Sequence, residues 1–238
     1  MRTIGEIKTE ILVRAGANTS AGFYSDTILD NWIDDAHKWV AGRKKWPATE
    51  GRSSTTFASL STNKDSYLQG QYPEGWKPDS IRRLSIDGKK VEKKDFYKFA
   101  EYLEDNSSAQ DRIFTDRFRY YYVNPNIDVS GSVVVWGQYT PATLDATDTD
   151  ATTVFSDGLE DLNEAIVEKS LSYASKREKD KNGSQLHEQN ALAIIKEAWD
   201  DITNEQFQYQ EIGGDGMFER FDVVEGGFRD DIIKRDRF

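Results

Sequence analysis

The apolar positions of the first 45 residues follow the period of two amphipathic helices. Thr3 and Glu6 have the spacing of a capping box, and the isoleucines around them recur on one face of the helix that the box would open. A second helix is predicted between Ser25 and Pro47, with acidic residues in its first turns and basic residues at its far end, an order that suits the helix dipole. Its expected apolar stripe comprises Ile28, Trp32, Ala36, Trp39 and Val40.

Residues 55–139 change to the pattern of β-strands. Within them, Asp87-Gly88 is a turn dipeptide suited to a tight hairpin between two apolar runs. Three further elements are expected here: two β-rich runs at 118–123 and 133–139, spaced as an antiparallel pair would be, and a short helix at 94–104.

The helical period resumes in the last third of the chain. Residues 142–153 are almost entirely Thr, Asp and Ala, so they form a polar connector back to helix. Asp157 and Glu160 form a cap-like pair at the start of the pattern. Asn182-Gly183 interrupts it, which predicts two antiparallel helices with a short break between them.

These patterns predict an α+β fold: a helical bundle of about four helices, a β-rich insertion between the second and third main helices, and an extended C-terminal tail. The helical body would comprise residues 1–51 and 142–205, the insertion residues 52–141 and the tail residues 206–238. The tail shows no helical period yet is rich in aromatics, so we expect it to become ordered against a partner. Its aromatic residues are Phe207, Tyr209, Phe218, Phe221, Phe228 and Phe238.

Composition then limits the class of protein. A chain of 238 residues with 37% hydrophobic side chains can fill a real core. Its formal charge of −11 argues against a protein whose main task is to neutralise a phosphate backbone, and the absence of cysteine excludes disulfide scaffolds and thiol nucleophiles. Because no apolar run approaches the roughly 18 residues of a membrane span, we expect a soluble chain made in a cytoplasm.

Few residues of the sequence suggest metal binding or acid–base chemistry. His37 lies three residues from Asp34, and His187 lies beside Glu188, but a zinc site needs three or four convergent ligands, so we predict neither metal nor cofactor. Neighbouring acids such as Asp200-Asp201 point apart on a helix, and the sequence contains no nucleophile elbow and no phosphate loop. We therefore predict that the chain is not an enzyme.

One segment combines basic and aromatic residues in the way that a nucleic-acid surface does. Phe96, Tyr97 and Phe99 follow three basic pairs along the chain. In an acidic protein, solvated faces explain such charges more often than binding does, but a contact with passing DNA or with an acidic partner stays open. The basic residues are Arg82, Arg83, Lys89, Lys90, Lys93 and Lys94.

The order of these elements resembles the head–tail adaptor (neck connector) proteins of bacteriophages, whose helical body is interrupted by a β-rich segment between its second and third main helices. The specific signature lies in residues 23–47, FYSDTILDNWIDDAHKWVAGRKKWP, which is similar to the family's Y-S-D-x-x-L-x-x-W-I-N-x-A opening. Asp34 stands where the family usually has Asn. The matching residues are Tyr24, Ser25, Asp26, Leu29, Trp32, Ile33 and Ala36.

Three generic likenesses follow in the same order, and together the motifs cover residues 1–205. Residues 72–91 are similar to the family's Y-x-L-P and I-x-x-V-x-I-D-G stretch, without its Leu-Pro pair. Residues 122–125 resemble a strand that ends in Asn-Pro, and residues 133–141 resemble the strand V-x-V-x-Y-x-x-x-P that precedes the returning helix.

The resemblance implies a structural virion protein of the head–tail neck, present in the host cytoplasm during assembly. Copies would form a homo-oligomeric ring of twelve subunits that docks on the phage portal protein and connects it to a stopper, nozzle or tail protein. Genomic DNA would pass through the lumen without sequence-specific binding, and no membrane would be involved.

Three other functions stay open from the sequence. Another virion component, such as a tail-tube or tail-terminator protein, would also be acidic and free of cysteine, although such proteins are usually dominated by β-structure. A small carboxylate-based hydrolase would show a concave pocket that holds two acids with strongly perturbed pKa values. A host interaction module would be a monomer and form no ring.

Overall fold

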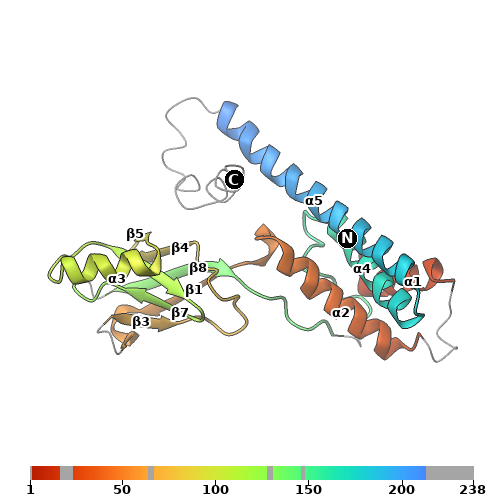
Figure 1. The fold of residues 1–238 in the computed structure, drawn as a ribbon, viewed down its shortest axis with the longest axis horizontal. Helices are drawn as coiled ribbons and strands as arrows, with labels where there is room; N and C mark the ends of the chain where they lie inside the picture. The colour runs from red at the N-terminus through yellow and green to blue at the C-terminus, as the bar shows by residue number, and fades with distance from the viewer. Residues whose placement is uncertain (1, 17–23, 64–66, 128–130, 146–147, 213–238) are drawn as a thin grey trace. The chain divides into compact units, whose positions relative to one another are not determined.

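The computed structural model describes residues 2–16, 24–63, 67–127, 131–145 and 148–212. The chain forms two compact units (Figure 1). We call the described residues of 2–49 and 140–212 the helical unit, and those of Glu50–Tyr139 the sheet unit. The helical unit contains four of the five described α-helices: α1 (Ile4–Arg14), α2 (Asp26–Arg43), α4 (Asp161–Arg177) and α5 (Lys181–Ile212).

The starts of α1 and α2 follow from local sequence. The Thr3 hydroxyl accepts a hydrogen bond from the Glu6 N–H at 3.2 Å, and the Glu6 carboxylate accepts one from the Thr3 N–H at 2.9 Å, so the predicted capping box is confirmed. Ser25 is the N-cap of α2, as expected. The break between α4 and α5 lies at residues 178–180, where Lys179 adopts a φ of 65°, and Asn182-Gly183 lies inside α5 instead of ending a helix.

The buried face of α2 differs from the stripe read from the sequence. Ile28, Trp32 and Trp39 are only partly buried, because the helix turns its neighbouring positions inward. The side chains that are fully buried on α2 are Leu29, Ile33, Ala36, His37, Val40 and Ala41.

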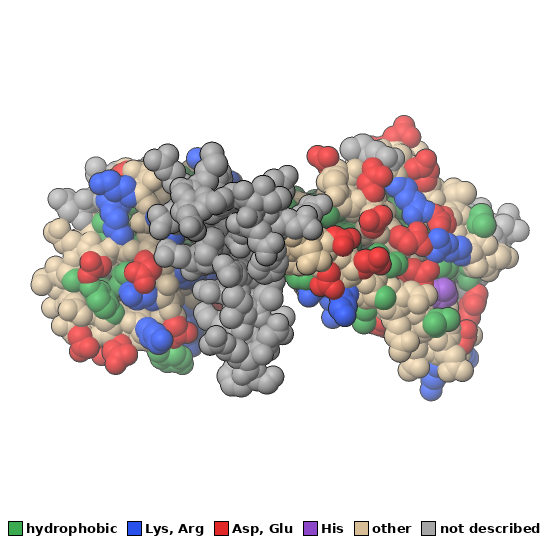
Figure 2. Space-filling view, turned by 90° about the horizontal axis from the view of Figure 1, so that it is seen from above, with side chains coloured by type: hydrophobic (Ala, Val, Ile, Leu, Met, Phe, Trp, Pro, Cys, Tyr) green, Lys and Arg blue, Asp and Glu red, His purple; other side chains and the backbone are tan. Residues whose placement is uncertain are grey.

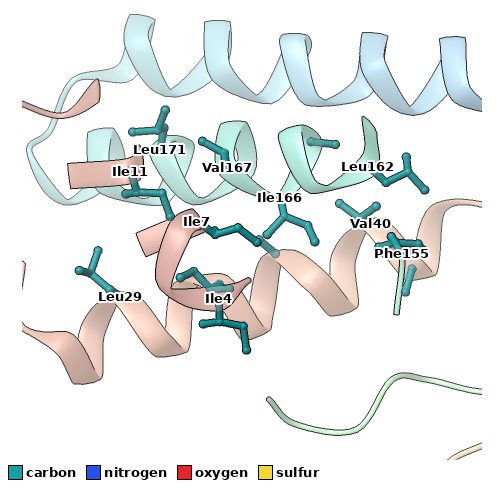
Figure 3. Close-up of a cluster of buried hydrophobic side chains, with 14 of the residues drawn as sticks. Ile4, Ile7, Ile11, Leu29, Val40, Phe155, Leu162, Ile166, Val167 and Leu171 are labelled. Atoms are coloured by element: carbon teal, nitrogen blue, oxygen red, sulfur yellow. The ribbon is translucent and has the colours of Figure 1, made fainter. Parts of the chain in front are cut away.

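Helix α4 is the centre of the helical unit and packs against α1, α2 and α5. Its Ile166 and Val167 belong to one apolar cluster with residues of α1, α2 and α5 (Figure 3). The helix is buried around nearly its whole circumference from Leu162 to Ala174, although five of its buried side chains are polar. Those five are Asn163, Glu168, Lys169, Ser170 and Ser172. Buried polar groups are costly without partners, and most of these have one: Ser170 donates to the Ile166 carbonyl of α4 itself, and Asn163 accepts from the Thr153 hydroxyl.

Trp46 closes one end of the same cluster. Its ring is fully buried and meets Phe155 and Trp199 edge to face, with centroids 6.1 and 5.5 Å away. Its indole Nε1–H donates to the Val40 carbonyl at 3.0 Å, so the polar end of the side chain is satisfied. The sequence pattern did not single out Trp46, since it lies just beyond the end of α2.

The sheet unit is one eight-stranded sheet in the order β1-β8-β4-β5-β6-β7-β3-β2. Neighbouring strands are antiparallel except β5 and β6, which are parallel and joined through α3 (Phe96–Asp105). The strands are β1 (Glu50–Thr56), β2 (Ser61–Thr62), β3 (Leu68–Gln71), β4 (Arg83–Ile86), β5 (Lys89–Lys93), β6 (Ile113–Arg117), β7 (Tyr120–Val123) and β8 (Ser132–Gln138). Two short 3-10 helices, η2 (Pro47–Thr49) and η3 (Phe57–Ser59), flank β1.

The two faces of the sheet have different cover. One face carries a large apolar cluster that includes Leu84, Val123 and Val135. Successive side chains of a strand alternate between faces, so Ile113 lies on the opposite face, where Phe99 and Leu103 of α3 pack against it. Helix α3 covers only part of that face (Figure 1).

The predicted bundle of about four helices with a β-rich insertion is wrong. The described chain has five α-helices, and its sheet has eight strands and apolar clusters of its own, so it is no small insertion. Three of its strands, β1, β2 and β3, are polar or very short and carry little sequence signal. Helix α5 also continues to Ile212, so residues 206–212 are helical where an extended tail was expected.

Two of the local elements predicted for the sheet unit are confirmed, and one predicted strand pairing is wrong. The hairpin at Asp87-Gly88 is confirmed, since both residues have positive φ (53° and 73°) and β4 pairs with β5 across them. The short helix is confirmed as α3. The pairing of 118–123 with 133–139 is wrong, because β7 pairs with β3 and β6, whereas β8 pairs with β1 and β4.

Replacing Trp46 with alanine should lower the free energy of unfolding of the helical unit by roughly 3–5 kcal/mol, because it removes a fully buried ring and leaves a cavity. Trp32→Ala is the matched control, and it should cost less than half as much because that ring is only partly buried. Denaturant unfolding followed by the helical circular dichroism signal measures both. Equal losses in the two variants would contradict the packing described for Trp46.

Candidate interaction surfaces

Three side chains from three adjacent strands lie together on the outer face of the sheet, the one that α3 covers only in part. Trp136 of β8 is the register partner of Arg52 on β1 and of Arg83 on β4. The guanidinium carbons of Arg52 and Arg83 lie 5.6 and 5.0 Å from the centroid of the Trp136 ring. We call these three residues the Arg–Trp–Arg ladder. Both arginines are exposed, so their planar donors are held against the ring and remain available to an anionic group.

Only part of the predicted basic segment belongs to this face. Arg83 is in the ladder, and Lys90 shares its face because it pairs with Ser85, two residues along β4. Lys93 is used within the fold: its ammonium donates to the Ile81 carbonyl at 2.7 Å and to Asp116 at 3.0 Å. The structure therefore separates residues that are adjacent in sequence.

The other three predicted basic residues have different surroundings. The guanidinium of Arg82 lies 4.0 Å from the carboxylate of Glu50. The ammonium of Lys94 lies 3.3 Å from the carboxylate of Glu92 and 5.5 Å from the Tyr102 ring centroid. Lys89 is exposed at the hairpin. Arg52 was missed by the sequence reading, because no local signal connects it to residues 31 and 84 positions away along the chain.

A second exposed group lies where α3 begins and β6 turns into β7. The guanidinium of Arg117 lies 4.6 Å from the Phe96 ring centroid and 5.6 Å from that of Phe118. Tyr97 and Phe118 are 74% and 66% exposed, and Phe118 adopts a φ of 57°, which is strained for an aromatic residue. The sequence reading placed Phe118 at the start of a strand, whereas it is a turn residue.

The predicted tail residues lie mostly outside the described part of the chain. Phe207 and Tyr209 belong to α5, which runs to Ile212, and their side chains are not among those described. Phe218, Phe221, Phe228 and Phe238 lie outside the described residues. Their role as a partner interface stays a prediction.

The negative charge of the protein is concentrated in one unit. Residues 50–139 contain 13 basic and 13 acidic side chains, whereas residues 1–49 and 140–212 contain 13 basic and 22 acidic ones. Figure 2 shows acidic side chains gathered over the helical unit, which is the right-hand part of that view. The sheet unit is neutral overall, so the acidity of the whole chain does not argue against an anionic partner for the ladder.

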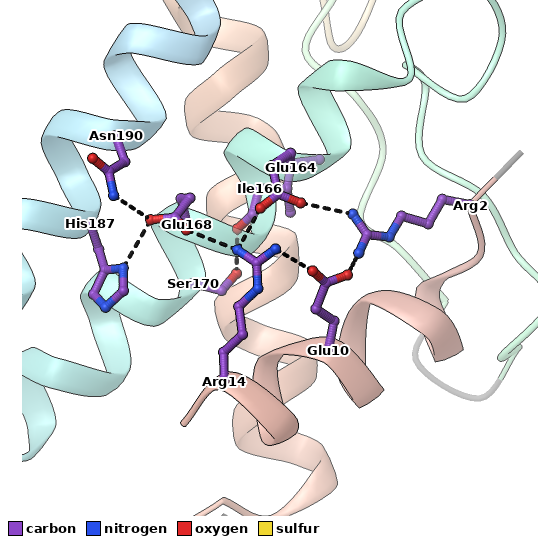
Figure 4. Close-up of polar contacts among 9 residues, drawn as sticks. All are labelled: Arg2, Glu10, Arg14, Glu164, Ile166, Glu168, Ser170, His187 and Asn190. Carbon is purple, nitrogen blue, oxygen red and sulfur yellow. Dashed lines mark hydrogen bonds and ion pairs between the residues drawn. The ribbon is translucent and has the colours of Figure 1, made fainter. Parts of the chain in front are cut away.

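A network of ion pairs binds α1 to α4 and α5 (Figure 4). Arg14 contacts Glu10, Glu164 and Glu168, the last at 2.9 Å. The other oxygen of Glu168 lies 2.9 Å from Nδ1 of His187 and accepts from the Asn190 side-chain amide at 3.2 Å. Glu168 is thus a structural anion at the junction of three helices.

Lys169, the next residue of α4, is also a buried charge with a partner of opposite charge. Its side chain is 3% exposed, and its ammonium lies 2.8 Å from Glu188 and 4.4 Å from the Trp39 ring centroid. The hydrogen bond from Lys169 lowers the pKa of the Glu188 carboxyl. Two neighbouring and opposite buried charges therefore find partners on different sides of α4.

His37 and Asp34 bond to the backbone of other segments. His37 Nε2 accepts a hydrogen bond from the Val154 N–H at 3.3 Å, and burial lowers the pKa of His37 to about 4. Asp34 accepts from the Leu144 N–H at 3.1 Å and pairs with Lys38. Among the described residues, no three His, Asp or Glu side chains are grouped as a metal site.

One cleft in the sheet unit lies beside β1 and has a volume of about 270 Å³. Its lining is made of serine, threonine, glutamine and apolar residues with a single tyrosine, and it includes no carboxylate, histidine or basic side chain. The pair of acids that a carboxylate hydrolase requires is therefore missing from this cleft.

The sheet unit thus exposes arginines against aromatic rings, and ion pairs link the helices of the helical unit. The family model of the SU10 adaptor protein matches residues 2–212, and the chain belongs to that family. The resemblance to phage head–tail adaptors is thereby confirmed, and the chain is a phage adaptor structural protein of the virion. A search of curated proteins found no match. No helix among the described residues is long and apolar enough to cross a membrane.

The buried imidazole of His37 should make stability depend on pH. The unfolded chain protonates this histidine near pH 6.5, whereas the folded chain does so only near pH 4, so neutral His37 contributes stability that is present above pH 6.5 and lost as the pH falls toward 4. The loss should total roughly 3 kcal/mol. His37→Gln keeps an acceptor for Val154 but cannot titrate, so the difference in unfolding free energy between protein and variant should change across this window. A constant difference would refute the assignment.

Breaking the Lys169–Glu188 pair from its two ends should give unequal results. Glu188→Gln leaves the buried ammonium without an anion and should cost about 1–3 kcal/mol, the lower part of the range reflecting the partial exposure of Glu188. Lys169→Met removes the charge but keeps the volume against Trp39, so it should cost less than about 1 kcal/mol. Urea unfolding of both variants tests this order, and a larger loss for Lys169→Met would contradict it.

Proposed function

We propose that copies of this chain form a closed ring in the neck of a tailed phage. The ring docks on the portal protein and joins it to a stopper, nozzle or tail protein, and genomic DNA passes through its lumen. Membership of the adaptor family supports a role between head and tail components. Twelve copies are what the resemblance implies.

The main support for the proposed ring is that the two units differ in charge and in the side chains that they expose. A cyclic assembly needs heterologous contacts, in which each subunit presents two different and complementary patches. The helical unit has an excess of acidic side chains, whereas the neutral sheet unit exposes the Arg–Trp–Arg ladder and the aromatic group around Phe118. A subunit with two unlike surfaces is suited to head-to-tail association around an axis.

The acidic excess also suits a channel for DNA. Carboxylates that line a lumen repel phosphates, so the duplex passes without adhering to the wall. Specific DNA recognition would instead need a row of basic side chains that reaches the base edges. Some basic residues of the sheet unit already pair with acids within the fold, as Lys93 does with Asp116.

The chain acts without catalysis in this proposal. Acidic residues such as Glu168 and Asp116 have partners within the fold, and the cleft beside β1 is lined by no acid or base. The adaptor family is a family of structural proteins. A nuclease, glycosidase or peptidase activity that disappears on replacing one acidic pair would overturn this part of the proposal.

Electron microscopy of the protein mixed with its portal tests the assembly. The expected result is a ring of density at the narrow end of the portal, with one symmetry axis through both components. A protein that stays monomeric and leaves the portal bare under these conditions would refute the proposed function.

The C-terminal residues should provide a large part of the attachment. Each aromatic anchor that fills a pocket on the portal or on a neighbouring copy contributes about 1.5–3 kcal/mol before ordering costs. A chain that ends at Ile212, the last described residue of α5, should keep the unfolding midpoint of the full chain but co-sediment poorly with portal particles. The matched control keeps full length and replaces Phe218, Phe221, Phe228 and Phe238 with serine. Undiminished binding by both variants would assign the attachment to the two units.

A further inference from the structure

A row of unpaired carboxylates lies on α5. Glu197, Asp200 and Asp201 are exposed, and none of the three carboxylates has an ion-pair or hydrogen-bond partner within the described part of the chain. Because residues three and four apart are neighbours on a helix, the three acids occupy one side within a single turn. Ala193 precedes Glu197 by four residues and is also exposed. We call these four residues the acidic row.

We propose that the Arg–Trp–Arg ladder of one copy binds the acidic row of a second copy. This contact rests on the proposed ring and identifies two of the patches that would close it. It joins the sheet unit of one subunit to the helical unit of the next, so it is heterologous and repeats around an axis.

The chemistry of the two surfaces is complementary. A guanidinium that lies on an aromatic ring is restrained in a plane, and its free edge matches the two oxygens of a carboxylate. Trp136 lies between the two arginines and restrains both guanidinium groups against its ring.

The spacings of the two surfaces differ by only about 4 Å. Arg52 and Arg83 lie on strands separated by one strand, so their backbones are about 10 Å apart. Carboxylates three or four residues apart on a helix have Cβ atoms about 6 Å apart. The longer side chains of arginine can bend inward over Trp136 and cover this difference.

A second copy fits these observations better than DNA does. A duplex is gripped by many cations along its backbone, whereas the ladder offers two exposed arginines with Lys90 beside them in a unit of zero net charge. A short row of carboxylates needs only two or three cations. The helical unit, with its excess of nine acidic side chains, supplies such a row in every copy.

Cysteine crosslinking tests the contact, because the natural chain contains no cysteine. Ser54→Cys places a thiol two residues from Arg52 on the same face, and Ala193→Cys places one in the acidic row of another chain. Only a contact between copies can join the two single-cysteine proteins. The matched control pairs Ser54→Cys with Thr9→Cys, an exposed position on α1.

The proposal expects a disulfide-linked heterodimer of Ser54→Cys and Ala193→Cys to form at least about tenfold faster than the control pair, both in concentrated full-length protein and in particles assembled with the portal. Adding Arg52→Glu and Arg83→Glu to the first chain should abolish the excess. Adding Glu197→Arg and Asp200→Arg to the second chain should restore it, a rescue that a merely structural effect of the substitutions would not produce.

Equal rates in the test and control pairs would overturn the contact. If electron microscopy shows rings on the portal while the rates are equal, the ring stands and this interface is wrong; if no ring forms, the proposed function fails with it. Fluorescence anisotropy with a labelled DNA duplex measures whether the ladder binds DNA instead. Binding that Arg52→Ala with Arg83→Ala abolishes, without any crosslinking excess, would assign the ladder to DNA and overturn the proposal.

Discussion

Burial of α4 is the constraint on which the helical unit depends. A helix surrounded by α1, α2 and α5 is normally apolar on all sides, yet α4 carries Glu168 and Lys169 side by side in its buried part. Each charge must be compensated or the fold would lose several kcal/mol. Arg14 from α1 and His187 from α5 meet the carboxylate, and Glu188 from α5 meets the ammonium. These pairs restrict how the helices can slide or rotate against one another, because a shift of one turn would separate every partner.

The sheet unit is stabilised differently, and this leaves part of it available for binding. Its large cluster lies on one face, and α3 covers only part of the other. Arg52, Trp136 and Arg83 therefore stay on an uncovered stretch where charged and aromatic side chains can be exposed without cost to the core. The strained Phe118 at the β6–β7 turn is a second position where an exposed aromatic is not explained by packing.

The difference in charge and exposed side chains between the two units suits an adaptor. One unit is acidic and contains a network of ion pairs between helices, and the other is neutral and exposes the Arg–Trp–Arg ladder. In a ring, such subunits would meet through unlike surfaces, and many weak contacts would act together. The buried histidine belongs to the packing of the helical unit, because His37 is held neutral by burial and accepts a hydrogen bond from the backbone of Val154.

The sequence by itself determined the features that depend on neighbours along the chain. The capping box at Thr3, the N-cap at Ser25, the Asp87-Gly88 turn and the motif that resembles the adaptor family each need only a few consecutive residues. The tertiary structure decided which polar residues are buried and which strands are adjacent. Arg52 meets Trp136 only because β1 pairs with β8 in one register, and a slip of one residue would place it on the other face. Such pairings balance loop-closure entropy against long-range contacts, and no local pattern records that balance.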